Sequence, residues 1–412
     1  MIHLKDFSLV TPALESHDIL KAIEIAIPAE AIEQAIAGTQ AFESRKRSLP
    51  AQLVVCLVIA MSFWSRDSMR DVLKNLIDGM SEAWVKVGKY WRVPCKSAIT
   101  QARQRLGARV MSQLFHQLVR PMASAETLGA FLQGLRIVVI DGTCFDVPDS
   151  DENARVFGRP PCRPGTIAAF PKVRLVILVE AGTQIIFDAL MCPYRMGERV
   201  RALRLLGSVK PGMLLMWDRG LHSYAMVKAT FDKKCDYLGR IPANVKFQAE
   251  KPLEDGSYLS RIYPSGKLRK RGCHPIQLRV IEYTIEHPEK PTEQLTYRLI
   301  TSLLDIAKFP AELLAKEYHQ RWEVENTIDE LKIHLSGRKT LVRSQKPREV
   351  VQEVYGWLLG HWAVRVLMFQ AATSASVPPV RLSFVGTLRV IRRAIPKFQR
   401  LNSKEFPLFS IG

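Results

Sequence analysis

Three acidic residues of this 412-residue chain have the type and setting of divalent-metal ligands. Asp141 and Asp218 each follow a run of buried-strand character, LRIVVI and GMLLMW, and Glu325 lies in a helix-like stretch. Carboxylate oxygens suit Mg²⁺, and two such ions about 4 Å apart can activate one oxygen and stabilise another during phosphoryl transfer. Each acid alone is more simply a turn former or a solvated residue. Together they predict a two-metal site.

The stretch after Pro310, AELLAKEYHQRWEVENTIDELKIHL, predicts a single helix with two distinct stripes. At about 100° per residue, four polar residues fall on one narrow stripe and four apolar residues fall beside it. The apolar stripe predicts packing against a core, so the polar stripe must face a site or a partner. The polar residues are Tyr318, Arg321, Glu325 and Lys332, and the apolar residues are Val324, Ile328, Leu331 and Leu335.

The order of these motifs resembles the DDE transposases of the insertion sequence 4 family. IDGT and WDRG are followed by Tyr, two residues, Arg, three residues, Glu, six residues and Lys, which is the Y-R-E-K hallmark of that family. The likeness extends over roughly residues 35–370 and includes FESRKRSLPAQLVVCLVIAM and SQKPREVVQEVYGWLL. Four matching residues within fifteen positions are more specific than three separate acids.

The resemblance implies a ribonuclease-H-like mixed-sheet α/β core with a β-rich insertion, preceded by an all-α domain. It implies that Asp141, Asp218 and Glu325 bind two Mg²⁺ ions, for which Mn²⁺ can substitute, and that Tyr318, Arg321 and Lys332 contact phosphates. The implied activity is hydrolysis at the ends of an insertion element, followed by attack of the 3′ hydroxyls on target DNA. The implied partners are the terminal inverted repeats, target DNA and a second copy in a synaptic homodimer. The alternatives are a catalytically silent end-binding relative and a free-standing metal-dependent nuclease.

The charge of the chain favours a polyanionic partner. Fifty-nine Lys and Arg against 40 Asp and Glu give a net charge of +19, and such an excess repels itself unless a partner neutralises it. A basic protein that is merely soluble is the alternative. The densest basic run is either a solvated turn or a phosphate contact. Its charged residues are Lys267, Arg269, Lys270 and Arg271.

Changes of pattern predict three segments. Residues 1–130 read as a helical DNA-binding domain, 131–373 as the catalytic domain with the insertion at about 243–304, and 374–412 as a basic tail. Within the first segment, residues 96–109 fit either a helix-turn-helix or a packed helical hairpin with Arg103 and Arg105 on a solvated face. Within the insertion, the apolar phase of IQLRVIEYTIE slips after Val280, which predicts a β-bulge.

Other candidates near the motifs are weaker. Asp141 is preferred to its acidic neighbours because it directly ends the predicted strand, and Glu325 to Asp329 because it fits the hallmark. Trp217 and Trp322 read as core or wall, and His222 and His319 as surface residues or outer supports of the site. The insertion contains no tryptophan for stacking a flipped base, so the hairpin step known in better-studied members is in doubt. The acidic neighbours are Asp146, Asp149 and Asp151, and the substitute stacking residues are Tyr258, Tyr263 and Phe247.

The cysteines and the apolar runs favour a reducing, cytoplasmic setting, and the resemblance to transposases implies association with the prokaryotic nucleoid. Seven cysteines without a CxxC pair predict neither a zinc site nor a disulfide framework. The longest apolar run, residues 53–64, is too short to span a bilayer. The N-terminal sequence MIHLKDFSLVTP lacks the continuous apolar stretch of a signal peptide.

Overall fold

The computed structural model describes residues 23–41, 48–78, 93–163, 165–287, 290–337 and 342–396. The chain forms two compact units. One comprises Met1–Leu118, Tyr355–Ser376 and Leu382–Gly412, and the other Val119–Val354 and Val377–Arg381. This division differs from the three predicted segments, because the chain after Val354 returns to the helical unit.

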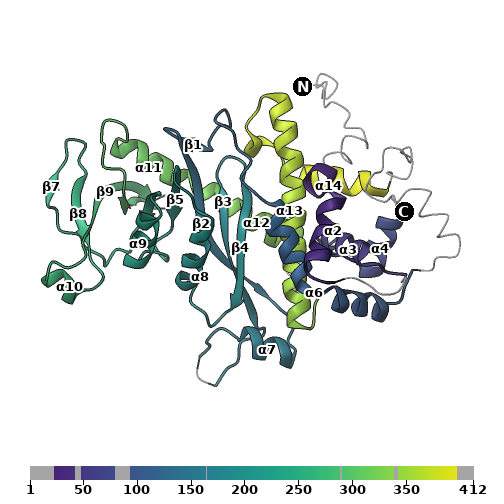
Figure 1. The fold of residues 1–412 in the computed structure, drawn as a ribbon. Coiled ribbons are helices and arrows are strands. Elements are labelled where there is room, and N and C mark those ends of the chain that lie inside the picture. Colours follow the sequence, from purple (N-terminus) through teal and green to yellow (C-terminus); the bar gives the residue numbers. More distant parts are fainter. Residues whose placement is uncertain are drawn as a thin grey trace. The chain divides into compact units, whose positions relative to one another are not determined.

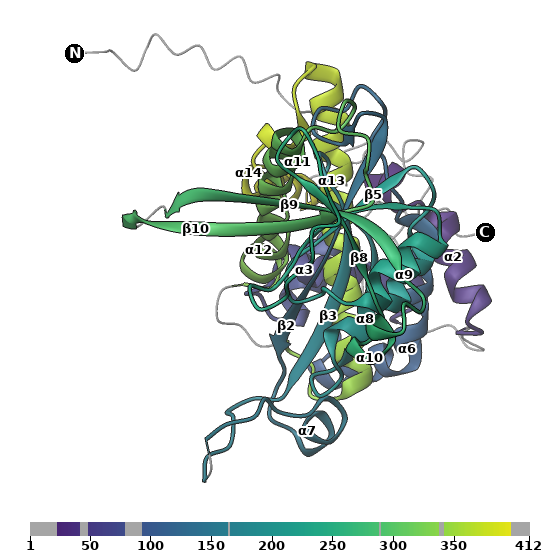
Figure 2. The ribbon, with the colours of Figure 1, turned by 90° about the vertical axis from the view of Figure 1, so that its left-hand side faces the viewer.

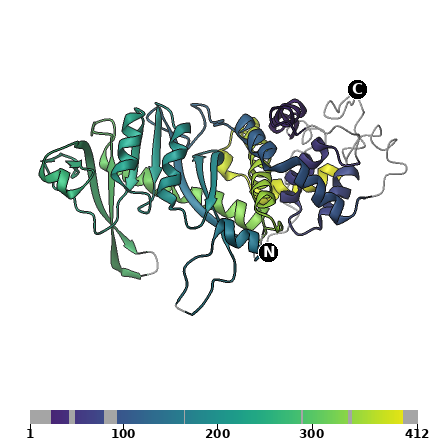
Figure 3. The same cartoon turned by 60° about the horizontal axis from the view of Figure 1, so that its bottom comes forward.

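The helical unit is built around an almost wholly buried helix. Helix α3 (Ala51–Phe63) is apolar on nearly all sides, so it needs neighbours all round. Gly356 and Gly360 let helix α13 (Pro347–Ala375) approach it closely: a Cβ on Gly356 would lie 2.6 Å from the Val58 carbonyl oxygen. Figure 3 shows these helices from both ends of the chain. The other helices are α2 (Ala29–Gly38), α4 (Met69–Asp78), α6 (Lys96–Leu118) and α14 (Phe384–Ala394).

Helix α6 consists of two helical halves, as predicted, joined at Gly107. Gly107 has a φ of 73°, which interrupts the helix. Arg105 is exposed, but Arg103 is only 2% exposed and its guanidinium contacts the Met69 sulfur at 3.6 Å. The expectation of a solvated Arg103 is therefore wrong.

Among the described residues, no helix combines the length and the apolar character needed to cross a membrane.

A mixed sheet forms the centre of the second unit (Figure 1). Strands β2, β3 and β4 form an antiparallel meander, whereas β5 and β6 run parallel to β2. The strands of the insertion extend this same sheet, because β10 pairs with β6. The order is β4-β3-β2-β5-β6-β10-β9-β8-β7, with β1 beside β2. The bounds are β1 Phe131–Leu132, β2 Leu135–Asp146, β3 Lys172–Glu180, β4 Ile185–Pro193, β5 Met213–Trp217, β6 Asp236–Arg240, β7 Lys251–Pro252, β8 Tyr258–Ile262, β9 Ile276–His287 and β10 Lys290–Thr301.

Helices cover both faces of this sheet. On β2, Ile137 and Val139 face helices α11 (Ala311–Gln320) and α12 (Trp322–Asp329), since they line a pocket with residues of both. Because side chains alternate along a strand, Gly142 faces the other way, toward helix α8 (Glu198–Leu205). Helix α9 (Tyr224–Asp232) packs against α8 and β6, and the shorter helices are α7 (Asp151–Phe157) and α10 (Gly266–Lys270).

The predicted bulge in β9 is wrong. The register is continuous from Ile276 to Val280 against β8 and from Arg279 to Glu286 against β10. The apolar phase slips because residues 278–281 are buried on both faces of the sheet. The described register shift lies instead in β10, between Lys290 and Gln294. Figure 2 shows the β9–β10 hairpin projecting from the rest of its unit.

The predicted helix after Pro310 is interrupted. Helix α11 ends at Gln320, α12 covers Trp322–Asp329, and residues Glu330–Leu335 are π-helical. A π-helix has more residues per turn than an α-helix, so it rotates Lys332 away from the position expected at 100° per residue. In the apolar stripe, Val324, Leu331 and Leu335 are buried as predicted, and Ile328 is half-buried.

The end of β5 is fixed by an indole that a glycine accommodates. The Trp217 side chain is fully buried and stacks on Tyr237, with ring centroids 5.2 Å apart. A Cβ on Gly239, which pairs with Trp217 across β5 and β6, would overlap the indole ring. Because Trp217 directly precedes Asp218, this packing sets the position of the acid.

We therefore expect Gly239→Ala to lower the free energy of unfolding by about 1–3 kcal/mol, the usual cost of overpacking a dense core. Urea denaturation followed by circular dichroism measures the change. The matched control is Gly207→Ala, since no atom lies within 4 Å of a Cβ built there. Equal losses in the two variants would contradict this account of the β5 end.

Candidate active site

Asp141 and Asp218 lie at the same level of the sheet. The expectation that Asp141 ends its strand is wrong, because β2 continues to Asp146. Its parallel neighbour β5, however, stops at Trp217, which pairs with Ile140. Asp141 is thus the first residue of β2 beyond the β5 pairing, and Asp218 is the first residue after β5. The two acids share the point where the parallel pairing ends, the usual place for a site in such sheets.

Backbone amides fix one oxygen of each aspartate. The Gly142 amide donates to Asp141 Oδ1 at 2.7 Å, and the Gly220 and Leu221 amides donate to Asp218 Oδ1 at 3.0 and 3.3 Å. Burial raises the pKa of Asp141 to about 6, and the negative charges of Asp218 and Glu198 add to this rise. The Gly142 N–H and the Arg321 charge oppose it. The pKa of Asp141 therefore depends on the charges of both Asp218 and Glu198.

The guanidinium of Arg321 lies between Asp141 and Glu325. Its Nη1 is 3.5 Å from Asp141 Oδ2, and its Nη2 is 3.6 Å from Glu325 Oε1. The Arg321 side chain is only 9% exposed, yet its Nε and Nη1 have no hydrogen-bond partner among the described residues. One buried cation thus gathers acids from two elements and retains unused donors.

The other hallmark residues differ in exposure. Tyr318 is 2% exposed, and its hydroxyl donates to the Trp217 carbonyl at 3.3 Å, which ties α11 to the end of β5. The Arg321 Cζ lies 5.7 Å from the Tyr318 ring centroid. Lys332 is exposed and lies close enough to Cys144 on β2 to oppose the rise in thiol pKa that burial causes. Solvent exposure within the predicted polar stripe therefore ranges from the buried Tyr318 to the exposed Lys332.

The competing acids have other partners or face solvent. Asp146 pairs with Lys172 at 2.6 Å, and Asp149 pairs with Arg159. Asp151 and Asp329 are exposed, and the described ion pairs of Arg321 are with Asp141 and Glu325.

The aromatic and histidine candidates are structural in this fold. Trp217 is a core residue, whereas the side chain of Trp322 lies outside the described residues. His222 is 9% exposed, and burial, helped by the Arg199 charge, lowers its pKa to about 4, so it is neutral near pH 7. His319 Nε2 lies 3.0 Å from the Tyr283 hydroxyl in a hydrogen bond.

The carboxylates suit a divalent cation, although they are not gathered around one point. Among the described residues, no group of three His, Cys, Asp or Glu side chains is close enough to hold a metal ion. Asp141 and Glu325 nevertheless converge on a common cation, the Arg321 guanidinium, which marks the place that positive charge occupies. Their donors are hard oxygens, which Mg²⁺ and similar ions prefer. The donor chemistry of these residues fits such an ion.

The sequence analysis did not find two charged residues beside the acids. Glu198 begins α8, and its Oε2 accepts a hydrogen bond from Arg174 Nη1 at 3.0 Å. Arg240 ends β6, the strand next to β5, and its Cζ lies 4.0 Å from the Tyr297 ring centroid. The strand-end rule that identified Asp218 also applies to Arg240, whereas nothing local distinguishes Glu198.

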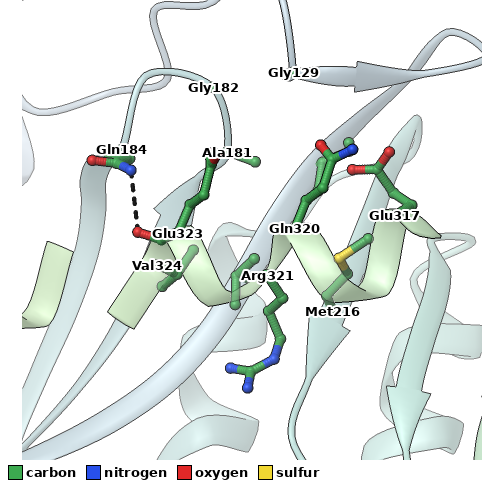
Figure 4. A pocket seen from close by; sticks show the side chains of 12 residues that line it. Gly129, Ala181, Gly182, Gln184, Met216, Glu317, Gln320, Arg321, Glu323 and Val324 are labelled. Atoms are coloured by element: carbon green, nitrogen blue, oxygen red, sulfur yellow. Dashed lines mark hydrogen bonds between the residues drawn. The ribbon is translucent and has the colours of Figure 1, made fainter. Parts of the chain in front are cut away.

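A small pocket beside the site contains none of the three acids. It lies between the α11–α12 region, the β3–β4 turn and the strands β2 and β5. Figure 4 shows Glu317 and Gln320 on its side of the helix, whereas the Arg321 guanidinium points away from them. Burial raises the pKa of Glu317 to about 7, with Glu323 adding to the rise. We regard this pocket as a packing gap behind the site.

The basic run of the insertion is an exposed helix, not a turn. Residues Gly266–Lys270 form α10, and Arg269 donates to Gln248 Oε1 at 3.2 Å. Of the proposed stacking residues, Tyr258 donates its hydroxyl to Glu282 at 2.7 Å, whereas Phe247 and Tyr263 are half-buried. A further aromatic pair, Tyr283 stacked on Tyr297 at 5.5 Å, lies next to His319. Aromatic groups of the insertion thus reach the hallmark helix.

Comparisons with known proteins agree with this site. Residues 18–116 match the insertion element 4 transposase N-terminal family, and residues 132–360 match the transposase DDE domain family. The chain is 24% identical over 384 residues to transposase InsG for insertion sequence element IS4 of Escherichia coli K12, covering 92% of this chain and 83% of that protein. Putative transposase InsZ of the same organism is 28% identical over 218 residues, covering 53% and 69%.

A solved structure has the same fold. The piggyBac transposase in a synaptic complex with hairpin DNA is 13% identical, with a TM-score of 0.50, and the match covers 96% of this chain and 83% of that one. That likeness concerns the ribonuclease-H-like fold alone. Because the DDE domain match spans more than half of the sequence and includes Asp141, Asp218 and Glu325, the chain belongs to the DDE transposases of the insertion sequence 4 type.

Proposed function

We propose that this DNA transposase moves its element by cutting and pasting. It hydrolyses the phosphodiester bond at each element end, and the freed 3′ hydroxyls attack phosphates of target DNA. One observation carries the proposal. Asp141 and Asp218 both follow the point where the β2–β5 pairing ends, and Glu325 and Asp141 both contact the Arg321 guanidinium.

The DDE family uses divalent metal ions, and we propose two Mg²⁺ ions here, for which Mn²⁺ substitutes. Asp141, Asp218 and Glu325 are the residues that hold them. When bound, the ions lower the pKa of the attacking water or hydroxyl and stabilise charge on the leaving oxygen. The protein supplies the rigid strand ends and the helix that keep the three carboxylates near one another.

Arg321 and Lys332 are proposed to bind phosphates of the element ends. The Nε and Nη1 of Arg321, which have no hydrogen-bond partner among the described residues, suit phosphate oxygens, which a guanidinium binds in a bidentate manner. Lys332 adds an exposed point charge nearby. Tyr318 supports Arg321, because the Tyr318 ring lies beside the guanidinium and the Tyr318 hydroxyl donates to the backbone at the end of β5. Its part in end binding is thus to place the arginine.

The remaining partners follow from the same proposal. The helical unit and the basic residues Lys267, Arg269, Lys270 and Arg271 are proposed to contact the inverted repeats, and two copies to join in a synaptic homodimer. The nucleoid in the cytoplasm is the proposed location. A silent relative would not need all three acids, and a free nuclease would not need the phosphate-binding side chains beside them. Both features favour the transposase over these alternatives.

Replacing Asp141, Asp218 or Glu325 by alanine is expected to lower strand cleavage at least about a hundredfold. End binding should stay within a few-fold, because the acids serve the chemistry more than docking. The assay incubates each purified variant with Mg²⁺ and DNA carrying the inverted repeats that flank its gene. Asp146→Ala and Asp329→Ala are the controls. Near wild-type cleavage by any triad variant would refute its assignment.

Lys332→Ala is expected to flatten the salt dependence of end binding. Each lost phosphate contact removes about 0.9 from the slope of log K against log salt concentration. Binding is measured by fluorescence anisotropy between 50 and 300 mM salt, and the joint neutralisation of residues 267–271 tests the insertion in the same way. Lys316→Ala, an exposed lysine on α11, is the control. If Lys332→Ala and Lys316→Ala share the wild-type slope, Lys332 is only a solvated residue.

A further inference from the structure

Glu198 reaches the centre from the face of the sheet opposite Arg321 and Glu325. It is the first residue of α8, and its Oε1 lies directly against Gly142, where a Cβ would overlap it. The Gly142 backbone does not have a positive φ, so the conformation does not require glycine. The absent side chain instead makes room for the carboxylate next to Asp141.

Two arginines fasten the start of α8, and one of them binds the Glu198 carboxylate. Arg174 on β3 binds Glu198 Oε2 at 3.0 Å and leaves Oε1 facing Gly142. The next residue, Arg199, donates from Nε to the Gly220 carbonyl at 2.6 Å, in the turn that binds Asp218. The start of α8 is therefore fastened both to β3 and to the Asp218 turn.

The hydrogen bonds of the centre leave one suitable oxygen on each of three acids. Asp141 and Asp218 each have Oδ1 occupied by backbone amides, and Glu198 has Oε2 occupied by Arg174. The oxygens that accept no described hydrogen bond are Asp141 Oδ2, Asp218 Oδ2 and Glu198 Oε1. A divalent cation takes several oxygen ligands at once. Three carboxylates that each have one oxygen held by the protein and the other available therefore suit such a cation better than two.

An independent observation indicates that this centre lacks a partner. The Arg321 side chain is nine-tenths buried, lies beside Asp141 Oδ2, and has two nitrogens without hydrogen-bond partners. A buried cation with unused donors is costly unless a ligand completes it. Phosphate oxygens would accept hydrogen bonds from the guanidinium, and a metal ion bound with them would balance the carboxylates.

We propose that Glu198 is a fourth carboxylate of the catalytic centre and supplies Oε1 to a divalent cation shared with Asp141 and Asp218. This inference rests on the proposed metal-dependent function. Arg174 orients Glu198 through the hydrogen bond to Oε2, and Gly142 leaves the carboxylate the necessary space. In the simpler alternative, Glu198 only neutralises Arg174 and stabilises the start of α8, where an acid is favourable.

The test measures metal binding without catalysis. Full-length protein without DNA is titrated with Mn²⁺, and the free ion is followed by electron paramagnetic resonance. Glu198→Gln keeps the size of the side chain and an oxygen for Arg174, so we expect a folded protein whose Mn²⁺ affinity falls at least about tenfold, the low end of what loss of a supporting residue costs. Gly142→Ala should weaken Mn²⁺ binding as well, since its Cβ displaces the carboxylate without changing charge.

Two controls separate the possible outcomes. Glu152→Gln makes the same change at an exposed acid in the first turn of α7, and it should bind Mn²⁺ like wild type. Asp141→Asn should lose binding. Normal affinity in Glu198→Gln while Asp141→Asn fails to bind would overturn the role of Glu198 alone. Absence of Mn²⁺ binding by wild type, or normal binding by Asp141→Asn, would overturn the proposed metal site together with the place of Glu198 in it.

Circular dichroism melting decides whether a loss of affinity reflects misfolding. Glu198→Gln is expected to melt within a few degrees of wild type, and Arg174→Gln provides the second arm. If Glu198 only balanced Arg174, Arg174→Gln would be as harmless to Mn²⁺ binding as Glu198→Gln. The proposal instead requires Glu198→Gln to lose affinity, and Arg174→Gln, which keeps the carboxylate but removes its orienting partner, to lose less of it; normal affinity in both variants would refute the proposal.

Discussion

The centre of this transposase depends on the charge between Asp141 and Glu325. Carboxylates gathered in a partly buried place repel one another and lose hydration, and both effects favour their neutral forms. Arg321 offsets this from the same helical region as Glu325, yet burial still raises the pKa of Asp141 to about 6. One guanidinium therefore neutralises the acids incompletely. A divalent ion carries twice that charge and would favour the ionised carboxylates more strongly.

Local sequence pattern identified the acids because each is marked by its immediate neighbours. The apolar runs before Asp141 and Asp218 and the spacing around Glu325 need no knowledge of distant contacts. The point where β2 ends does need such knowledge: GTCFD looks like a loop, but β3 pairs with it as far as Asp146. The interruption after Gln320 and the π-helical segment were equally hidden, because a regular 3.6-residue period assumes an unbroken helix.

Pairings between distant segments also explain why the two compact units differ from the predicted segments. The apolar run of α3 predicts a buried helix, but it does not say which segments bury it. Helices before Leu118 cover part of it, and α13 covers more through the close approach at Gly356 and Gly360. These glycines lie some three hundred residues later and resemble ordinary helix interior positions. Sequence pattern could separate the helical segment from the mixed α/β segment, but it could not show that the chain after Val354 returns to the helical unit.

The early end of β5 connects the two faces of the sheet. A continuous sheet would keep α8 and α12 apart, since side chains on opposite faces of paired strands cannot meet. Beyond Trp217, β2 pairs with no strand on the β5 side among the described residues. Glu198 lies against the Gly142 backbone from one face, and Arg321 meets Asp141 from the other. The buried indole of Trp217 and the bare backbone of Gly239 fix where β5 stops. A packing feature of the core thus decides which charged groups of both faces converge.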